Sequence, residues 1–284
     1  MNKMNPLFSI LIANYNNGIF LPDAINSALS QTYKNFEIII VDDCSNDNSG
    51  ILYEQYQDDA RIKVFKNAKN QGCGYTKDRC VREASGELCG FLDPDDKLEY
   101  NALARMVNEF ANKPDIVMAY SNHYVTDESF NVSSIFKGRS LCTGESILTS
   151  KSGPVSHFVA FKRNAYILSG GVDICMKRCV DYDMYYRLEE MGPISYVDEC
   201  LYWYRQNEHS ISLGKNVYSA SAWQIYSCVN AMKRRGLEDE SLMMFPLERA
   251  LCTSADVVRN TITFRIGKFI TRPVKWFIER RNKK

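Results

Sequence analysis

Residues 91–97 read Phe-Leu-Asp-Pro-Asp-Asp-Lys, so that a short apolar run ends in three acids within four residues. This pattern predicts a buried strand that carries carboxylates to the open edge of a sheet, where α/β folds bind ligands. Carboxylates this close repel one another, and a divalent cation relieves the repulsion. A solvated turn whose acids cap a helix near Tyr100 explains the same residues, and the stretch alone does not separate the two interpretations.

The first 120 residues alternate between strand and helix patterns. Apolar runs predict strands at 7–13, 37–41, 62–65, 88–92 and 116–120, and apolar residues at helical spacing predict helices at 21–31, 49–58, 76–84 and 101–110. The alternation implies βαβ units and therefore an α/β fold with a Rossmann-like, mainly parallel sheet flanked by helices. After Leu213 the pattern changes to a helical C-terminal extension, with one helix predicted at 217–232.

The composition is that of an ordinary globular protein, with 284 residues of which 45% are hydrophobic and 24% charged. The ten cysteines form no C-x-x-C pair, which favours neither a zinc site nor a disulfide framework. We interpret them as reduced core cysteines of a cytosolic protein. The first residues lack the pattern of a signal peptide, and no apolar run approaches the roughly 18 to 20 residues of a spanning helix, so we expect a cytoplasmic location.

The charge is concentrated at the end of the chain. Residues 262–284 carry eight basic side chains and one acidic one, a net of +7, and since the whole chain has +1 the remainder has about −6. Basic and apolar residues interleaved in this way predict an interfacial helix on an anionic membrane. A helix docked on the main domain and a nucleic-acid contact are the alternatives. We expect no nucleic acid, because the acidic body repels phosphate and no recognition motif is present.

Polar side chains follow the first two predicted strands, as Asn14-Tyr15-Asn16-Asn17-Gly18 and as Asp42-Asp43-Cys44-Ser45. The first loop lacks G-x-G-x-x-G and the chain lacks a Walker A motif, which disfavours dinucleotide-dependent enzymes and P-loop NTPases. An aromatic ring, amides and acids at one sheet edge suit a nucleobase and a metal-bound diphosphate. For Asp42 and Ser45 we favour a structural role as caps of the following turn.

The ordered set of motifs resembles the inverting family 2 glycosyltransferases with the GT-A fold, of the bacterial surface-polysaccharide type. The resemblance covers roughly residues 6–212 and rests on the segments 8–16, 21–33, 40–49, 70–72, 84–87 and 91–96. It implies a GT-A domain at 1–213, with a nucleotide-sugar-binding half at 1–120 and an acceptor half at 121–213. A helical extension at 214–261 and the basic amphipathic tail at 262–284 would follow.

The resemblance implies a donor site. In it, Ala13 and Tyr15 line the base pocket, and Asp43 accepts the N3–H of a uracil-type base. Asp93 lies at the ribose and reaches the metal through water, while Asp95 binds the metal directly. The implied cation, Mn²⁺ or Mg²⁺, neutralises charge that develops on the nucleoside diphosphate leaving group.

One segment departs from the family pattern. Thr76-Lys77-Asp78 stands where the family commonly has Ala-Arg-Asn. Lys77 keeps a positive charge for the donor phosphates but lacks the bidentate geometry of a guanidinium. Asp78 places an acid where an amide is usual.

The acceptor half carries the implied base. Residues 180–188 resemble the family segment Glu-Asp-x-Asp-Leu-x-x-Arg-Leu, with Val180 in place of the usual Glu and with Asp181 at the position of the general base. Asp183 and Arg187 are four residues apart on a predicted helix, so we predict a structural ion pair. His209 follows a Tyr-Arg pair as in the family's Tyr-Arg-x-x-x-His segment, where it either completes the metal shell, as in some relatives, or is a plain surface residue.

The resemblance thus implies an inverting, metal-dependent glycosyltransferase, and we expect it to be a hexosyltransferase. The donor would be a UDP-linked sugar, and the acceptor a hydroxyl of a saccharide or lipid-linked saccharide used in cell-surface polysaccharide synthesis. The basic tail would hold the enzyme peripherally at the inner face of the membrane. The alternative is a non-catalytic nucleotide-sugar-binding protein with a degenerate transferase fold, which the presence of Asp181 disfavours.

Overall fold

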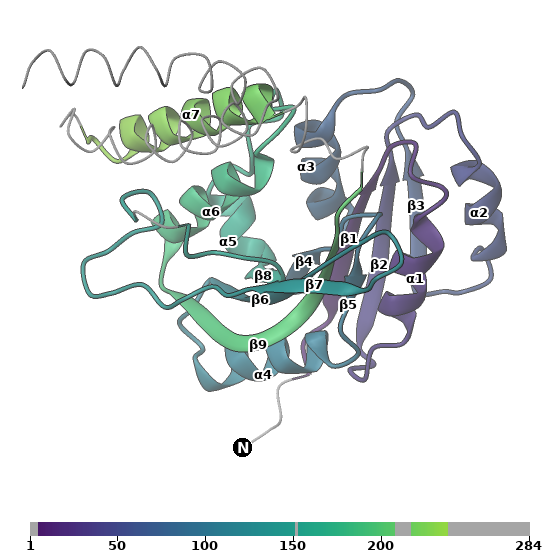
Figure 1. The fold of residues 1–284 in the computed structure, drawn as a ribbon, viewed down its shortest axis with the longest axis horizontal. Helices are drawn as coiled ribbons and strands as arrows, with labels where there is room; N and C mark the ends of the chain where they lie inside the picture. Colours follow the sequence, from purple (N-terminus) through teal and green to yellow (C-terminus); the bar gives the residue numbers. More distant parts are fainter. Residues whose placement is uncertain (1–4, 151–152, 208–216, 238–284) are drawn as a thin grey trace, which may run out of the picture.

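The chain forms an α/β structure around a single nine-stranded sheet (Figure 1), which the computed structural model describes for residues 5–150, 153–207 and 217–237. The strands are β1 (Phe8–Asn14), β2 (Phe36–Asp42), β3 (Ile62–Lys66), β4 (Leu88–Phe91), β5 (Lys97–Leu98), β6 (Met118–Thr126), β7 (Val132–Phe136), β8 (Val159–Lys162) and β9 (Ile194–Arg205). The helices are α1 (Leu21–Leu29), α2 (Ser49–Gln55), α3 (Cys73–Glu83), α4 (Ala102–Asn112), α5 (Arg163–Leu168), α6 (Val180–Met191) and α7 (Val217–Arg234).

The sheet has the strand order β3-β2-β1-β4-β8-β6-β9-β5, and β7 pairs with β6 outside this path. Strands β1 to β4 are parallel, so the ends of β1 and β2 meet at one edge, where Asn14 pairs with Asp42. Strand β8 is antiparallel to both of its neighbours, while β6 and β9 are parallel to each other. The predicted α/β class and the parallel first half are confirmed. Strands β5, β7, β8 and β9 had no predicted counterpart.

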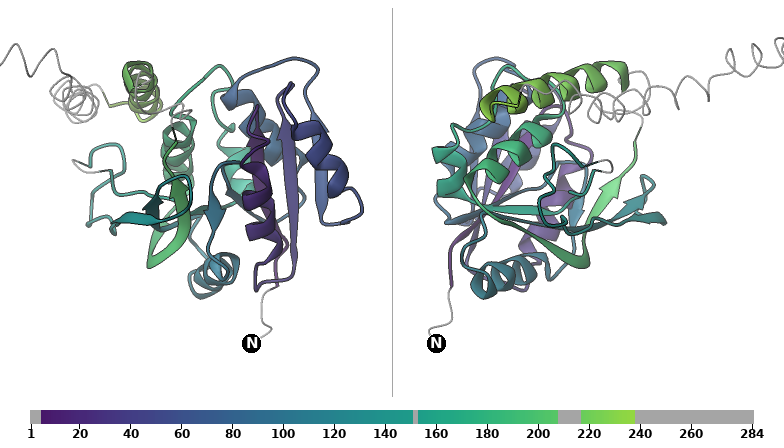
Figure 2. Two further views of the ribbon diagram at one scale, coloured as in Figure 1. Left: turned by 45° about the vertical axis from the view of Figure 1, so that its right-hand side comes forward. Right: turned by 90° about the vertical axis from the view of Figure 1, so that its left-hand side faces the viewer.

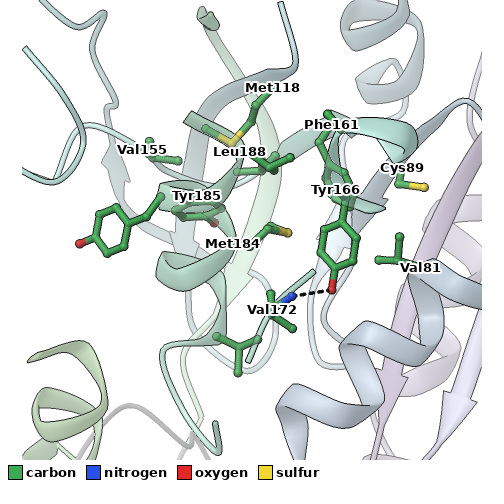
Figure 3. Close-up of a cluster of buried hydrophobic side chains, with 14 of the residues drawn as sticks. Val81, Cys89, Met118, Val155, Phe161, Tyr166, Val172, Met184, Tyr185 and Leu188 are labelled. Carbon is green, nitrogen blue, oxygen red and sulfur yellow. Dashed lines mark hydrogen bonds between the residues drawn. The ribbon is translucent and has the colours of Figure 1, made fainter. Parts of the chain in front are cut away.

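Helices cover both faces of the sheet (Figure 2), and each face has its own hydrophobic core. Phe8, Ile10 and Ile12 alternate along β1 and face the core that includes residues of α1 and α4. Leu11 belongs to the opposite core, which includes residues of α3, α5 and α6. Figure 3 shows part of this second core around Tyr166, whose hydroxyl oxygen accepts a hydrogen bond from the backbone N–H of Val172 at 3.2 Å. A strand covered on both faces reads as a continuous apolar run, which explains why these strands were predictable.

Helix α7 packs on the outside of α6 (Figures 1 and 2), and its presence confirms the helix predicted at 217–232. Arg234 at the end of α7 and Arg235 directly after it bond to Glu190 on α6 at 2.9 and 3.0 Å. The amphipathic tail, the rest of the helical extension after residue 237 and His209 lie outside the described residues. Within the described part of the chain, no helix is both long enough and apolar enough to cross a bilayer.

The prediction that the cysteines belong to the core is only partly correct. Three of the nine cysteines in the described residues, Cys80, Cys89 and Cys228, are buried. Three others, Cys44, Cys142 and Cys175, are exposed. The prediction was wrong for those three because they lie in loops rather than in strands or helices.

A buried carboxylate ties the amino ends of the parallel strands together. Glu37 on β2 accepts hydrogen bonds from the Ser9 hydroxyl at 2.7 Å, from the Ser85 N–H at 2.6 Å and from the Lys63 ammonium at 2.8 Å. Ser9 in turn accepts the N–H of Gly86 at 2.9 Å. Burial alone would raise the pKa of Glu37, but the bonds from Lys63, Ser9 and Ser85 hold this pKa below its ordinary value. The network explains why a Ser and a Glu occupy buried strand positions.

We predict that Glu37→Gln lowers the free energy of unfolding at pH 7 by about 1.5 to 3 kcal/mol, because charge-assisted hydrogen bonds are lost. A carboxylate with a lowered folded pKa stabilises the protein above its ordinary pKa of 4.5 and loses this effect as the pH falls. The difference between wild type and variant should therefore shrink below pH 4.5. Denaturant unfolding at several pH values measures it. Glu54→Gln, an exposed change on α2, is the control and should be neutral at every pH.

Candidate active site at the carboxyl ends of the parallel strands

The loops that follow β1 and β2 are bonded to each other. Asn14 donates to the Tyr53 hydroxyl at 2.8 Å and to the Ser49 hydroxyl at 3.0 Å, and Tyr53 donates to the Asp42 carboxylate at 2.6 Å. Asp42 also accepts the N–H of Ser45 at 2.8 Å. The structural capping role predicted for Asp42 is confirmed, and these bonds fix the two loops side by side.

Ala13 and Tyr15, the predicted base pocket, stand at this loop pair. Ala13 is half-buried, whereas the Tyr15 side chain is 45% exposed. The next residue, Asn16, is anchored because its N–H donates to the Ser45 hydroxyl at 2.9 Å and its side-chain oxygen accepts the Asn46 N–H at 2.9 Å. The Ser45 bond confirms the structural role predicted for that residue. An exposed ring on an anchored loop suits stacking against a flat ligand, and the base contact stays a prediction.

Asp43 has a role that its sequence position did not reveal. One carboxylate oxygen accepts from the Asn67 amide at 2.7 Å and the Gln71 N–H at 2.8 Å, and the other accepts from the Gly72 N–H at 2.8 Å. Gly72 precedes α3 with φ at 92°, a left-handed conformation that glycine adopts without strain. Asp43 therefore fixes the start of α3. A carboxylate offers about four lone-pair positions, so the predicted bond to a base remains possible in addition.

Lys77, the fifth residue of α3, joins the two halves of the site. Its buried ammonium lies 3.1 Å from the Asp93 carboxylate and 2.8 Å from the Asp181 carboxylate, and 5.0 Å from the centre of the Phe91 ring. Burial alone would lower the pKa of Lys77, but Asp181 and Asp93 raise it well above its ordinary value. Burial would likewise raise the pKa of Asp181, but the positive charge of Lys77 and then an electrostatic contribution from His157 lower it. Asp181 is therefore ionised at neutral pH.

The loop before α6 approaches α3 closely, and Gly74 permits this approach. The N–H of Gly74 donates to the Met176 carbonyl at 2.9 Å, and a Cβ at Gly74 would lie 2.7 Å from the carbonyl oxygens of both Asp173 and Met176. Any larger residue would push this loop away from α3. Because α6 begins directly after the loop, Gly74 brings Asp181 within reach of Lys77.

Helix α6 itself is held by a buried ion pair. Asp183 accepts from the Arg187 guanidinium and from the Asp173 N–H, both at 2.9 Å. The structural pair predicted from the spacing of Asp183 and Arg187 is confirmed. Asp78 is structural as well, because its carboxylate accepts from Arg82 at 2.6 Å and from the Tyr166 hydroxyl at 3.0 Å.

The three acids after β4 have different surroundings. Asp96 is buried and accepts from the Tyr202 hydroxyl and the Arg205 N–H, both at 2.7 Å. Asp95 accepts from the Asn207 amide at 2.7 Å. Burial and then the charge of Asp93 raise the pKa of Asp95, and burial with Asp95 and Asp93 raises the pKa of Asp96 well above its ordinary value. The sequence placed all three acids in one ligand cluster, whereas the structure uses Asp96 to fix the loop on β9.

Asp93 and Asp95 fit a divalent cation. Burial and then the charge of Asp93 raise the pKa of Asp95, and a nearby cation would offset both effects. The bonds from Lys77 to Asp93 and from Asn207 to Asp95 occupy only part of the lone pairs of each carboxylate. Among the described residues, no group of three His, Cys, Asp or Glu side chains forms a complete metal site. Further ligands would have to come from the bound donor, from water or from His209.

Sequence reasoning missed three residues of the site. The Tyr202 hydroxyl accepts a hydrogen bond from the Asp93 N–H at 3.1 Å, and the Asn207 amide donates one to Asp95. His157 contributes to the lowered pKa of Asp181. Asn207 and Tyr202 lie in the segment around Arg205 that resembles the family, so their place in that segment was an available signal. His157 comes from the stretch before β8, which carried no recognised motif.

Comparisons with known proteins show which family the sequence matches. The model of the family described as Glycosyl transferase family 2 matches residues 9–167. Chondroitin synthase of Escherichia coli is 32% identical over 201 residues, which is 70% of this chain but 29% of the synthase, so the chain spans less than a third of that relative. The putative teichuronic acid biosynthesis glycosyltransferase TuaG of Bacillus subtilis is 25% identical over 230 residues, covering 80% of this chain and 89% of TuaG.

Solved structures show the same fold. TarS of S. aureus in complex with UDP-GlcNAc has a TM-score of 0.65 at 17% identity and covers 89% of this chain and 74% of its own. The mannosyltransferase PcManGT from Pyrobaculum calidifontis, in complex with GDP-Man and Mn²⁺, has a TM-score of 0.60 at 12% identity and covers 98% of this chain and 83% of its own. The predicted GT-A fold is confirmed.

We predict that Lys77→Met destabilises the protein by about 3 kcal/mol at pH 7, because two carboxylates are left without their shared buried cation. Asp181 has a lowered folded pKa, so its stabilising effect is complete above its ordinary pKa of 3.8 and is lost at lower pH. The difference from wild type should therefore narrow below about pH 4. Denaturant unfolding at a series of pH values from about 8 down to about 2.5, well below the ordinary pKa of 3.8, measures it.

The matched control is Lys69→Met, which removes the ammonium of an exposed lysine. A solvated surface charge contributes less than about 1 kcal/mol, so the control should change little at any pH. A loss in Lys77→Met no larger than in Lys69→Met would show that the bridge does not stabilise the site.

Proposed function

This chain belongs to glycosyl transferase family 2, and we propose that it is an inverting, metal-dependent hexosyltransferase that uses a UDP-linked sugar. The observation that carries the proposal is the pairing of Asp93 and Asp181 with Lys77. It brings the predicted donor-side acid and the predicted general base, which are 88 residues apart in the chain, to one buried ammonium group. A base next to a diphosphate site is the arrangement that direct sugar transfer needs.

The reaction is a single displacement at the anomeric carbon of the donor. The acceptor oxygen forms a bond to that carbon while the bond from the carbon to the diphosphate oxygen breaks, and the electron pair of the broken bond leaves on the diphosphate. The proton of the acceptor hydroxyl goes to the Asp181 carboxylate, which is ionised at neutral pH because Lys77 lowers its pKa. Attack from the face opposite the leaving group inverts the configuration.

The remaining residues bind and position the donor. Tyr15 would stack on the base and Asp43 would accept from it. The Lys77 ammonium, which pairs with Asp93 and Asp181, would also face the donor phosphates. Asp95 would hold Mn²⁺ or Mg²⁺ directly and Asp93 through water. When bound, such a cation neutralises the charge that develops on the leaving diphosphate.

The relatives support the choice of substrates. Chondroitin synthase and the teichuronic acid enzyme act in polysaccharide synthesis according to their names, and TarS was solved with UDP-GlcNAc, which supports a UDP-linked donor. PcManGT was solved with GDP-Man and Mn²⁺, which supports a nucleotide sugar and a divalent cation. We propose a saccharide or lipid-linked saccharide of the cell surface as the acceptor, with the basic tail at 262–284 holding the enzyme at the inner face of the membrane.

The alternative function, a nucleotide-sugar-binding protein without catalysis, shares the donor site but needs no base. Donor turnover separates the two functions. A catalytic protein hydrolyses or transfers a UDP-sugar in the presence of Mn²⁺, whereas a sensor binds it and releases it unchanged.

The role of Asp95 is tested by Asp95→Asn. We expect divalent-dependent turnover of the donor to fall below detection, because the amide removes the charge that binds the cation. The fold should remain, since the change also relieves the repulsion from Asp93. Asp58→Asn, an exposed change, is the control. Wild-type turnover with Mn²⁺ in Asp95→Asn would remove this residue from the metal site.

The role of Asp181 is tested by Asp181→Asn, which keeps the shape of the side chain but accepts a proton poorly. We expect transfer to fall by roughly 10² to 10⁴-fold, with the affinity for UDP close to wild type. Steady-state transfer and calorimetric titration with UDP measure the two quantities. Loss of UDP binding along with transfer would instead assign Asp181 to the donor site.

A further inference from the structure

A row of aromatic rings runs from the acidic loop across the acceptor half of the sheet. Tyr202 lies beneath the loop and bonds to both Asp93 and Asp96. His157 stacks on Tyr202 with 5.0 Å between ring centres and on Tyr204 with 6.0 Å, at interplanar angles of 22° and 4°. The row therefore begins at the predicted metal and donor site.

The row continues onto the hairpin formed by β6 and β7. His123 contacts His157 and Tyr204, each at 5.6 Å between ring centres, and stacks on Phe136 at 5.1 Å and 3°. The strand register explains this arrangement, because His123 pairs with Tyr202 on one side and with Phe136 on the other. Directly paired residues lie on one face of a sheet, so the pairing places the rings of Tyr202, His123 and Phe136 next to one another.

The rings of the row differ in exposure. Tyr202 is fully buried and His123 is nearly so, His157 and Tyr204 are half-buried, and Phe136 is 43% exposed. A ring cluster that served only the core would bury all its members. His157, Tyr204 and Phe136 instead remain partly accessible, in a row of ring contacts that reaches Tyr202 below the acidic loop.

His157 lies in this row next to Tyr202, on which its ring stacks. The Tyr202 hydroxyl accepts the N–H of Asp93 at 3.1 Å, and Asp93 shares the Lys77 ammonium with Asp181. The row is therefore linked by contacts to the predicted base. Within the described residues, the ring nitrogens of His157 have no hydrogen-bond partner, so the imidazole can bond to a hydroxyl of a bound molecule.

We propose that His157, Tyr204 and Phe136 form the subsite for the terminal hexopyranose of the acceptor, an inference that rests on the proposed function. The C–H face of the sugar ring stacks on the aromatic rings, because its weakly positive hydrogens meet their negative faces and because this face is apolar. His157 bonds to a ring hydroxyl and orients the attacking hydroxyl toward Asp181. Imidazole and phenol groups between the rings suit a saccharide better than a lipid chain, which has no hydrogen-bonding groups.

The chain offers a direct binding assay, since it has only three histidines, His123, His157 and His209. Burial lowers the pKa of His123 to about 3, so its imidazole signals in an NMR spectrum do not titrate between pH 5 and pH 8, and His209→Gln removes a second set. The third set reports on His157. We would titrate the full chain, saturated with UDP and Mg²⁺, with the methyl glycosides of glucose, galactose and N-acetylglucosamine, with uridine and with a short-chain alkyl phosphate.

We expect at least one glycoside to shift the His157 signals, and Phe136→Ala to weaken its binding by about 3- to 10-fold. Ile135→Ala is the matched control, because Ile135 is the neighbouring residue on β7, equally exposed at 48% but on the other face. It should bind the glycoside as wild type does. If no glycoside shifts the His157 signals, if only uridine or the alkyl phosphate does, or if both variants weaken binding alike, the subsite is overturned.

These outcomes are separate from those of the proposed function. Binding of a glycoside at His157 requires no turnover, so it can be present in a protein that transfers no sugar. Where transfer is measurable, Phe136→Ala should raise the KM for the acceptor by the same 3- to 10-fold with little change in kcat. The control Ile135→Ala should leave both parameters as in wild type.

Discussion

The buried ammonium of Lys77 between Asp93 and Asp181 is the interaction on which the site depends. Two carboxylates in a partly buried space repel each other, and the cation between them offsets this repulsion where the acidic loop meets the start of α6. Lysine suits this position because its compact charge serves two partners from a single point, whereas a guanidinium would pair with one carboxylate in a planar fork. The lysine at position 77, where the family commonly has an arginine, therefore suits the two carboxylates that surround it.

The position of Lys77 is fixed by backbone contacts at the start of α3. Asp43 holds the N–H groups of Gln71 and Gly72 from the end of β2, and the absence of a side chain at Gly74 lets the loop before α6 reach the same helix. Segments from both halves of the chain thus meet at one helix end. The polar loop after β2, which was predicted to contact a ligand, also positions α3.

Features that depend on near neighbours in sequence were predictable, and those that depend on distant partners were not. The buried parallel strands and the Asp183–Arg187 pair follow from apolar runs and from helical spacing. The antiparallel strand β8 has only four residues and derives its place from pairing with β4 and β6, so no local pattern indicates it. Likewise, the charge of Lys77 suggested phosphates because the sequence cannot show that Asp181, 104 residues later, reaches it.

Strand β9 contacts both the acidic loop and the hairpin of β6 and β7 in the proposed acceptor half. Tyr202 and the backbone of Arg205 hold Asp96, while the Arg205 side chain pairs with Asp23 on α1 at 2.5 Å. The aromatic residues of the same strand face the hairpin of β6 and β7, which has an exposed outer strand. The acidic loop therefore has a fixed position, whereas the outer strand of the hairpin carries the exposed ring of Phe136. Because the proposed acceptor subsite includes this ring, changes in the hairpin should alter acceptor binding without disturbing the ion pairs around Lys77.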